Sequence, residues 1–451
     1  MFSNHEIDMT QGSITKKMIM FALPLMMSSF LQLLFNEADI AIVGRFGGDD
    51  YLASVGAAAA PCRLLTNIII GISTGVNILV GKAIGSRNDK EISTAIHTSV
   101  TLGVIVGLIV GTLGVLISKR LLIAMDTPDR ILPYSVLYMR ILYAGAPLIT
   151  EYNFLSAVLR AKGDTYRPLI ILTVAGVVNI IFNLFFVIIL KLNVVGVALA
   201  TIISQGLSMV LIIVLMTKEN GAYKLCVSKI GIRAKYVKGF LLIGIPSGIE
   251  GSLFSLSNMV IQSSINSYGE IVMAGSSASN SLEHFAFAGM NSFSQAGVSF
   301  ASQNIGAEKY DRIPAIFHRT LLCNIVSATF WGGMLVIFGR ILLGIYTKND
   351  LVIEQGILRL TYLCGPYFLC GASDSLPGIV RSMGHPVIPT VITLSGTCVF
   401  RVIWILTVCQ LPACNTVNWV YMSYGISWLI TFVIHYISYI WAYTNIRAKG
   451  I

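Results

Sequence analysis

The sequence predicts an all-α membrane protein with twelve transmembrane helices, arranged as two homologous six-helix lobes. Three observations predict this class. The 451 residues are 55% hydrophobic and only 12% charged, about half the charged fraction of an ordinary soluble domain. Twelve apolar segments are long enough to cross a bilayer, and motifs of the first half recur in the second. So few charges could not cover a core of this size in water, so we expect lipid to surround most of the chain.

The apolar segments are separated by stretches rich in Gly, Asn and charge, such as GRFGGDD and KAIGSRND. About 20 residues are needed to cross the roughly 30 Å of hydrocarbon in a bilayer. The predicted spans are 18–43, 53–81, 93–117, 134–159, 168–190, 194–216, 239–265, 272–302, 316–338, 357–380, 388–409 and 417–443.

Lysine and arginine are distributed unevenly between the gaps. The gaps on the side of the N-terminus hold more than twice as many as those on the other side, and the largest cluster lies between the sixth and seventh spans. Such an excess marks the cytoplasmic side of a membrane protein. We expect a multi-pass protein of the inner (cytoplasmic) membrane with both termini in the cytoplasm. The N-terminus shows no cleavable signal pattern, so the first span is expected to be retained.

The two halves match each other in order and spacing. LSAVLRAKG at 155–163 aligns with LPGIVRSMG at 376–384, an offset of 221, and Pro24 aligns with Pro246 at an offset of 222. Because each half has six spans, both halves have the same orientation, which predicts a parallel repeat about an axis along the membrane normal. The predicted domains are an N-lobe at 1–217, a basic cytoplasmic linker at 218–238 and a C-lobe at 239–451.

The sequence lacks the motifs that are typical of several classes of function. The net charge is +10, but the basic residues form no continuous face, so we expect no nucleic-acid partner. The eight cysteines are scattered without a CxxC pair, which favours apolar packing over metal ligation or disulfides. There is no nucleotide-binding GxxxxGK[ST], no GxSxG and no HExxH. We therefore expect no enzymatic activity, no cofactor and no nucleotide, with energy supplied by an ion gradient.

Four segments resemble the multidrug and toxic compound extrusion (MATE) family: the opening MTQGSITKKMIMFALPLMMSSFLQLLFNEADIAIVGRFGG, then LSAVLRAKGDTYRP, NVVGVALAT and VSFASQNIGAEKYDRI. The resemblance covers essentially the whole chain. It implies a V-shaped pair of lobes that exports organic cations, drugs or metabolites by alternating access in exchange for H⁺ or Na⁺. The implied partners are a small cationic or amphipathic substrate and the lipid bilayer, and we expect a monomer.

The wider superfamily also contains flippases of lipid-linked precursors, so the resemblance leaves the substrate open. A flippase would favour a strongly cationic cavity. In this sequence, acids outnumber arginines within the predicted spans. We therefore keep the flippase as the alternative to the antiporter.

The resemblance places a candidate cation site in the N-lobe. Asp39 lies in the outer half of the first span, at the place of the family's helix-1 acid, which takes part in cation coupling. Asn179 and Asn183 share one face of the fifth helix and, with Thr201, match polar positions that line the N-lobe cavity in the DinF-like branch. One carboxylate with amide and hydroxyl oxygens can hold Na⁺, and it can equally hold a proton. At position 183, where the resemblance to archaeal members of the family implies an acid, this sequence has Asn183. The loss of one negative charge weighs against tight Na⁺ binding. The alternative is a purely structural pairing.

The C-lobe holds a second pair of acids, Glu250 and Asp374. The NorM-like branch uses an acid on each of these helices, and here both lie about one turn nearer the cytoplasm. The alternative is that each acid is satisfied locally. Glu283 and His284 are a possible proton relay, or a pair facing the headgroups.

Other residues of the spans have structural interpretations. Arg381 and its repeat mate Arg160 are interpreted as ends of helices at the cytoplasmic face. Pro24, Pro246 and Pro377 are expected to kink or interrupt their helices.

Overall fold

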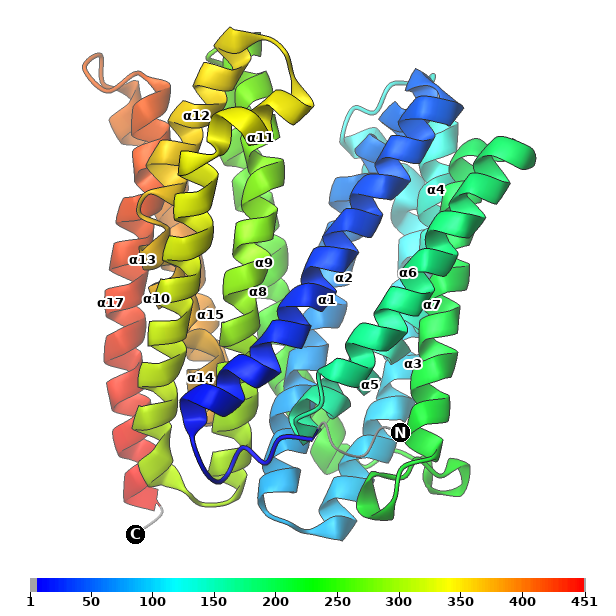
Figure 1. Cartoon of the computed structure of the whole chain (residues 1–451), viewed down its shortest axis with the longest axis vertical. Coiled ribbons are helices and arrows are strands. Elements are labelled where there is room, and N and C mark those ends of the chain that lie inside the picture. The colour runs from blue at the N-terminus through cyan, green and yellow to red at the C-terminus, as the bar shows by residue number, and fades with distance from the viewer. Residues whose placement is uncertain (1–5, 450–451) are drawn as a thin grey trace. The chain divides into compact units, whose positions relative to one another are not determined.

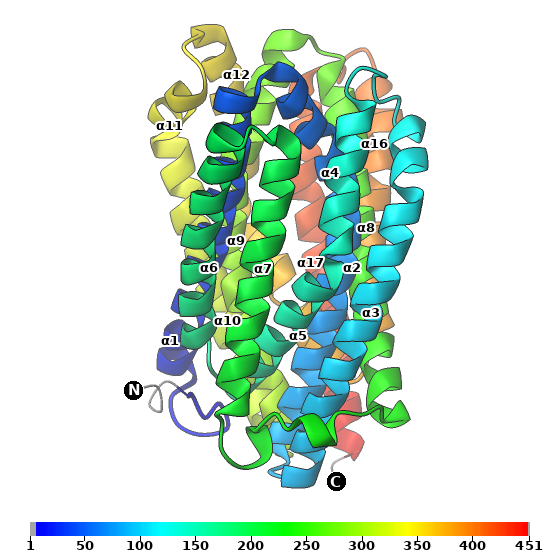
Figure 2. The same ribbon diagram turned by 90° about the vertical axis from the view of Figure 1, so that its right-hand side faces the viewer.

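The computed structural model describes residues 6–449, and this range contains helices and no strand. Residues 1–5 and 450–451, at the outer ends of the predicted lobes, lie outside the described residues. Within each of the two compact units that make up the chain, the long helices run lengthwise side by side (Figures 1 and 2). The α-helices are α1 (Ile14–Ile42), α2 (Asp49–Gly85), α3 (Asp89–Ala124), α4 (Leu132–Ala144), α5 (Ala146–Lys162), α6 (Tyr166–Leu184), α7 (Asn193–Thr217), α8 (Ala234–Asn266), α9 (Glu270–Gly306), α10 (Ile313–Ile337), α11 (Gly339–Tyr346), α12 (Asp350–Cys364), α13 (Tyr367–Asp374), α14 (Pro377–Ser382), α15 (Val387–Thr393), α16 (Phe400–Thr407) and α17 (Val417–Lys449).

The predicted fold class is confirmed. Nine helical segments of the described residues are long and apolar enough to cross a membrane. The three other predicted spans fall on α4 with α5, on the serine-rich α9, and on α12 to α14. Two of these three are interrupted, one at Gly145 and the other at Gly365–Pro366 and at Ser375–Leu376. An interruption shortens the continuous apolar run without removing the crossing.

The backbone repeats at the predicted offset. A positive φ is an unusual backbone conformation, and it is rare for any residue other than glycine. Three pairs of residues with positive φ stand 221 positions apart. Their φ angles agree within a few degrees. The pairs are Gly48 (105°) and Gly269 (106°), Arg87 (55°) and Glu308 (57°), and Gly163 (98°) and Gly384 (97°).

The chain divides into two compact units that are not contiguous halves. The N-terminal unit contains Met27–Gly248 and the residues up to Asp8, and the C-terminal unit contains Met9–Met26 and the residues from Ile249 onward. The division therefore falls inside α1 and inside α8, two residues after Pro24 and two after Pro246. The first part of each repeat's leading helix belongs to the unit of the other repeat. The lobe boundaries 1–217 and 239–451 describe the sequence repeat and stay a prediction.

The three prolines occupy two kinds of position. Pro24 and Pro246 lie inside continuous helices. Pro377 is the first residue of α14, directly after the interruption that follows Asp374. Only this third proline stands at a break, where its missing N–H is least costly.

Glycines let the helices of the N-terminal unit approach closely. A Cβ at Gly71 of α2 would overlap the backbone of Gly248, and one at Gly244 would overlap Ile72. The α2–α8 contact thus uses GxxxG spacing on α8, a pattern typical of membrane helices.

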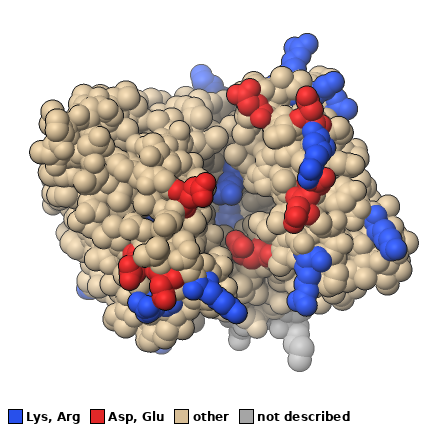
Figure 3. Space-filling view, turned by 90° about the horizontal axis from the view of Figure 1, so that it is seen from above, with Lys and Arg blue, Asp and Glu red and all other residues tan. Residues whose placement is uncertain are grey.

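The outer surface is apolar. Large side chains such as Leu116, Ile189 and Ile341 have exposed fractions of 67%, 66% and 70%. Figure 3 shows one end of the molecule, where acidic and basic side chains lie among uncharged ones. An apolar surface this large would be a liability in water, and lipid is the solvent that suits it.

Candidate functional site

The candidate site of the N-terminal unit begins with a close approach of α1 to α6. A Cβ at Gly176 would overlap the ring of Phe35, so the absence of a side chain at Gly176 makes room for α1. Asp39 follows Phe35 by one helical turn, and Asn179 and Asn183 follow Gly176 by one and two turns. The contact therefore brings the carboxyl of Asp39 to the amides of α6.

The structure brings the four residues predicted in this unit into one cluster. Asn183 Nδ2 donates to Asp39 Oδ1 at 2.5 Å and to Asn179 Oδ1 at 3.2 Å. Thr201 Oγ1 lies 3.5 Å from Asp39 Oδ2, but it lies closer, at 3.0 Å, to the carbonyl oxygen of Val197. The single hydroxyl proton of Thr201 therefore goes mainly to Val197. Asp39 is held chiefly by the amide of Asn183.

The oxygen atoms of this cluster suit a small hard cation. Asn183 Oδ1 is buried without a hydrogen-bond partner, although its own amide nitrogen donates to Asp39. Turning that amide over would place Oδ1 beside the carboxylate of Asp39 and the oxygen of Asn179, which are ligand types that Na⁺ accepts. No group of three or more His, Cys, Asp and Glu exists among the residues described. The cluster can hold Na⁺ or a proton on Asp39.

In the C-terminal unit, Asp374 is held by neutral donors. It is the last residue of α13. Ser294 Oγ donates to its Oδ2 at 2.6 Å and Asn291 Nδ2 at 3.3 Å. Asn324 Nδ2 donates in turn to Ser294 Oγ at 2.8 Å, and Asn324 Oδ1 is buried without a partner. Asn291, Ser294 and Asn324 were not predicted from the sequence. Their only signal was polarity inside apolar spans.

Glu250 lies close enough to Asp374, the acid with which the sequence pairs it, for their charges to interact. It forms an ion pair with Arg381, which also reaches Thr390 Oγ1 at 3.4 Å. Arg381 lies in the last turn of α14, as predicted, but it is only 7% exposed, so it is also a buried counter-charge within the unit. No hydrogen bond or ion pair is recorded between Glu250 and Asp374.

Glu283 likewise pairs with an arginine. Arg359 Nε lies 3.1 Å from Glu283 Oε1, and Arg359 NH1 donates to Ser276 Oγ at 2.6 Å. This pairing fixes Glu283 inside the unit, and the half-buried His284 follows it on α9. The proton relay of Glu283 and His284 remains a prediction.

A third arginine, Arg401, is buried among aromatic rings. It is 1% exposed, its guanidinium carbon lies 4.1 Å from the ring centroid of Tyr424, and Nε donates to Ser427 at 2.8 Å. Cation–π contacts of this kind stabilise a charge that has no acidic partner. Arg401 therefore anchors the helices of its unit.

A network of charged side chains joins the end of α5, the start of α6 and the end of α7. Glu219, just after α7, accepts a hydrogen bond from Lys162 Nζ at 2.7 Å and pairs with Arg167. Arg167 also pairs with Asp164. Burial alone would raise the pKa of Glu219, but the hydrogen bonds and charges of Lys162 and Arg167 outweigh burial and hold that pKa below its ordinary value.

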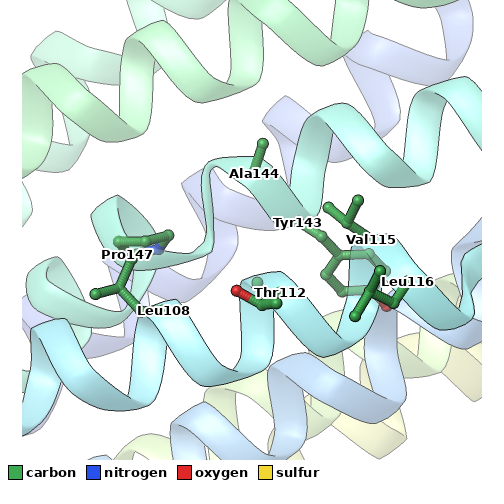
Figure 4. A pocket seen from close by; sticks show the side chains of 8 residues that line it. Leu108, Thr112, Val115, Leu116, Tyr143, Ala144 and Pro147 are labelled. Carbon is green, nitrogen blue, oxygen red and sulfur yellow. The ribbon is translucent and has the colours of Figure 1, made fainter.

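A shallow groove lies beside the interruption between α4 and α5. Figure 4 shows Tyr143 and Ala144 on one side of the break and Pro147 on the other, with Thr112 facing them from α3. The lining contains no acidic or basic side chain. The groove therefore lacks the groups for ion coupling.

The comparisons with known proteins agree with one family. The MatE family model matches residues 24–185 and 246–406, one match in each half of the chain. The Bacillus subtilis protein described as "Probable multidrug resistance protein YpnP" is 26% identical over 87% of this chain and 88% of its own length. A second B. subtilis protein, "Probable multidrug resistance protein YoeA", is 28% identical over 85% of each.

Solved structures share the fold. A structure described as the outward-facing conformation of a multidrug resistance MATE family transporter superposes with a TM-score of 0.90 at 18% identity, covering 99% of both chains. The family match spans most of both repeats, and the relatives align along nearly their whole lengths. This chain therefore belongs to the MATE family of membrane-embedded efflux transporters.

Proposed function

We propose that the protein is an antiporter that exports organic cations, drugs or metabolites across the cytoplasmic membrane in exchange for H⁺ or Na⁺. The observation that carries the proposal is the environment of Asp39. Its recorded partners, Asn183 and Thr201, are neutral, so no protein cation balances its charge. An uncompensated carboxyl inside a membrane is costly, and binding and releasing a cation is the role that suits it.

The coupling follows from differential binding. A ligand shifts an equilibrium between two conformations only by its difference in affinity for them. Asp39 sits on α1, and coupling requires that its surroundings differ between the two conformations. An entering cation supplies about 2.3 kcal/mol per charge for each 100 mV of membrane potential. Alternating access thus requires only that cation and substrate favour opposite states.

The substrate class is proposed from charge and from relatives. The curated relatives YpnP and YoeA are named as multidrug resistance proteins. In each unit an acid, Asp39 or Asp374, accepts its hydrogen bonds from neutral groups, and such acids favour cationic over anionic cargo. We further propose a monomer with both termini in the cytoplasm.

The test is transport in proteoliposomes with a fluorescent organic cation as cargo. A pH gradient and a Na⁺ gradient are imposed separately, each at zero membrane potential. We expect one of them to accelerate movement of the probe at least tenfold over protein-free vesicles, and collapse of that gradient to abolish the effect. Movement of a lipid-linked oligosaccharide that is independent of both gradients, with none of the cation, would reject the antiporter in favour of a flippase.

A further inference from the structure

Glu151 is a buried carboxyl without a recorded partner. It lies on α5 with an exposed fraction of 2%, and neither side-chain oxygen has a hydrogen-bond partner. A Cβ at Gly103 of α3 would overlap Glu151 Oε2. The carboxyl therefore rests directly against the backbone of α3, in space that only a glycine leaves open.

No cation of the surrounding helices neutralises Glu151. The helices packed against α5 are α2, α3, α4 and α7, and α7 carries no charged residue. His97 of α3 is engaged with Ser93 and with the backbone of Cys226. No ion pair or hydrogen bond is recorded between Glu151 and any of the basic side chains on α2 to α5, namely Arg63, Lys82, Lys90, Lys119, Arg120, Arg140, Arg160 and Lys162.

The isolation of Glu151 decides its charge. An ionised carboxylate buried without a donor or counter-ion costs several kcal/mol, whereas a protonated carboxyl avoids most of that cost. Other acids in the spans avoid it differently: Glu250 and Glu283 by arginines, Asp39 and Asp374 by amide and hydroxyl donors. Na⁺ would need several oxygen ligands, and the neighbours of Glu151 include apolar core residues such as Phe154.

We propose that Glu151 is a second proton-binding site of the N-terminal unit, separate from Asp39, and that it holds a proton in the conformation described here. Asp39 contacts α6 and α7, whereas the carboxyl of Glu151 lies against α3. The α5 helix begins after the break at Gly145, so it can shift against α3 and open the carboxyl to water. Release of the proton then accompanies the change of conformation. This role in transport rests on the proposed antiport, but the protonated state does not.

The protonated state is tested by infrared spectroscopy of the purified protein in lipid at pH 7, with ¹³C-labelled glutamate to separate Glu from Asp bands. We expect a protonated glutamic-acid band that Glu151→Gln removes. The band should survive in Asp39→Asn and in Glu37→Gln, the matched control at an exposed acid of α1. A spectrum that Glu151→Gln leaves unchanged would show an ionised Glu151 and overturn the proposal.

The role in transport is tested with the same variant and with Glu151→Met, an apolar side chain of similar length that needs no partner. We expect both to bind the organic cation within twofold of wild type and to lose at least tenfold in pH-driven efflux. Efflux within twofold of wild type in either well-folded variant would overturn the role in coupling. A wild-type protein that moves no cation under any gradient would instead reject the proposed antiport, while the infrared result would still stand.

Discussion

The acidic side chains inside the helices differ in how their charge is compensated. Glu250 and Glu283 each have a guanidinium partner, Arg381 and Arg359. Asp39 is held by neutral groups. Substituting a carboxyl that pairs with an arginine leaves a buried cation uncompensated. Substituting a carboxyl that is held by neutral groups removes a charge and leaves no other charge behind. The same change of acid to amide should therefore lower stability more where the acid has a guanidinium partner than where it is held by neutral groups.

Asp39→Asn should abolish coupled export, lowering the rate at least tenfold, while expression and monodispersity in detergent stay nearly intact. Asparagine keeps the shape and a hydrogen-bond acceptor for Asn183, but it cannot exchange a proton or balance a cation. The measurement is gradient-driven efflux of a fluorescent organic cation, normalised to protein in the membrane. Glu37→Gln, two residues away and exposed, is the control. Retention of more than half the wild-type rate would contradict the assignment.

The two acids of the C-terminal unit should differ from each other. Glu250→Gln leaves Arg381 buried without its counter-charge and should lower stability by about 3–5 kcal/mol. Asp374→Asn removes a charge that Ser294 and Asn291 hold, so it should cost about 1 kcal/mol but reduce efflux at least tenfold. Thermal unfolding in detergent and proteoliposome efflux measure the two effects. Equal losses of stability in both variants would contradict this distinction.

The sequence could indicate part of the site. Asn179 and Asn183 show their shared face by spacing alone, and the resemblance placed Asp39 and Thr201 beside them. The partners of Glu250 and Glu283 could not be found this way, because Arg381 is 131 residues from Glu250 and Arg359 is 76 from Glu283. Neither pair has a local spacing rule. Such contacts depend on how separate helices pack.

The network around Glu219 gives a prediction about pH. Its pKa in the folded protein is lower than its ordinary value of 4.5, so its contribution to stability is present above pH 4.5 and is lost as pH falls through the folded-state pKa. Glu219→Gln should be less stable than wild type by about 1–3 kcal/mol at pH 7, and the difference should shrink below pH 4.5. Melting curves from pH 7 to 4 measure it, with the exposed Glu354→Gln as control. A difference that grows on acidification would contradict the sign.

At the scale of the helices, the sequence predicted where the chain crosses the membrane better than it predicted whether each crossing is one continuous helix. The span 134–159 contains the break at Gly145, and 357–380 contains those near Pro366 and Ser375. Hydropathy averages over a window and cannot detect one or two residues that leave helical geometry. Pro377 was a usable signal for the last break. Gly145 was not distinguishable from glycines that lie inside continuous helices, such as Gly107.

The contact of α2 with α8 depends on the absence of side chains. Gly71→Ala would place a methyl group into the backbone of Gly248, and overpacking of this kind costs about 1–3 kcal/mol. We expect a lower melting temperature in detergent and reduced monodispersity. Gly333→Ala is the matched control, because a Cβ there meets no atom within 4 Å. Equal melting temperatures for the two variants would show that α2 and α8 do not pack as closely as described.

At the scale of the whole molecule, the backbone repeats but the chemistry does not. The offset of 221 that relates the left-handed residues relates Asp39 to Val260 and Asp374 to Asn153. Each unit therefore carries its own acid at a position where the other unit has a neutral residue. Duplication supplied two similar helical frameworks, and the charged groups that a cation or proton would use have diverged between them.

The basic residues predict how the molecule is oriented in the membrane. The linker between α7 and α8 carries the largest cluster of lysine and arginine, and such clusters remain in the cytoplasm. In a variant without the eight native cysteines, a cysteine in this linker at the exposed Ser228 should react with a membrane-impermeant maleimide only after cells are permeabilised. A cysteine at the exposed Asp129, between α3 and α4, should react in intact cells. The backbone of Cys226 in the linker bonds to His97, near the start of α3, so the linker lies at that end of the helix. Asp129 follows the other end of α3. Because α3 crosses the membrane once, the two probes must report opposite sides. Labelling of Ser228→Cys in intact cells, with Asp129→Cys protected, would mean that the chain inserts the other way round.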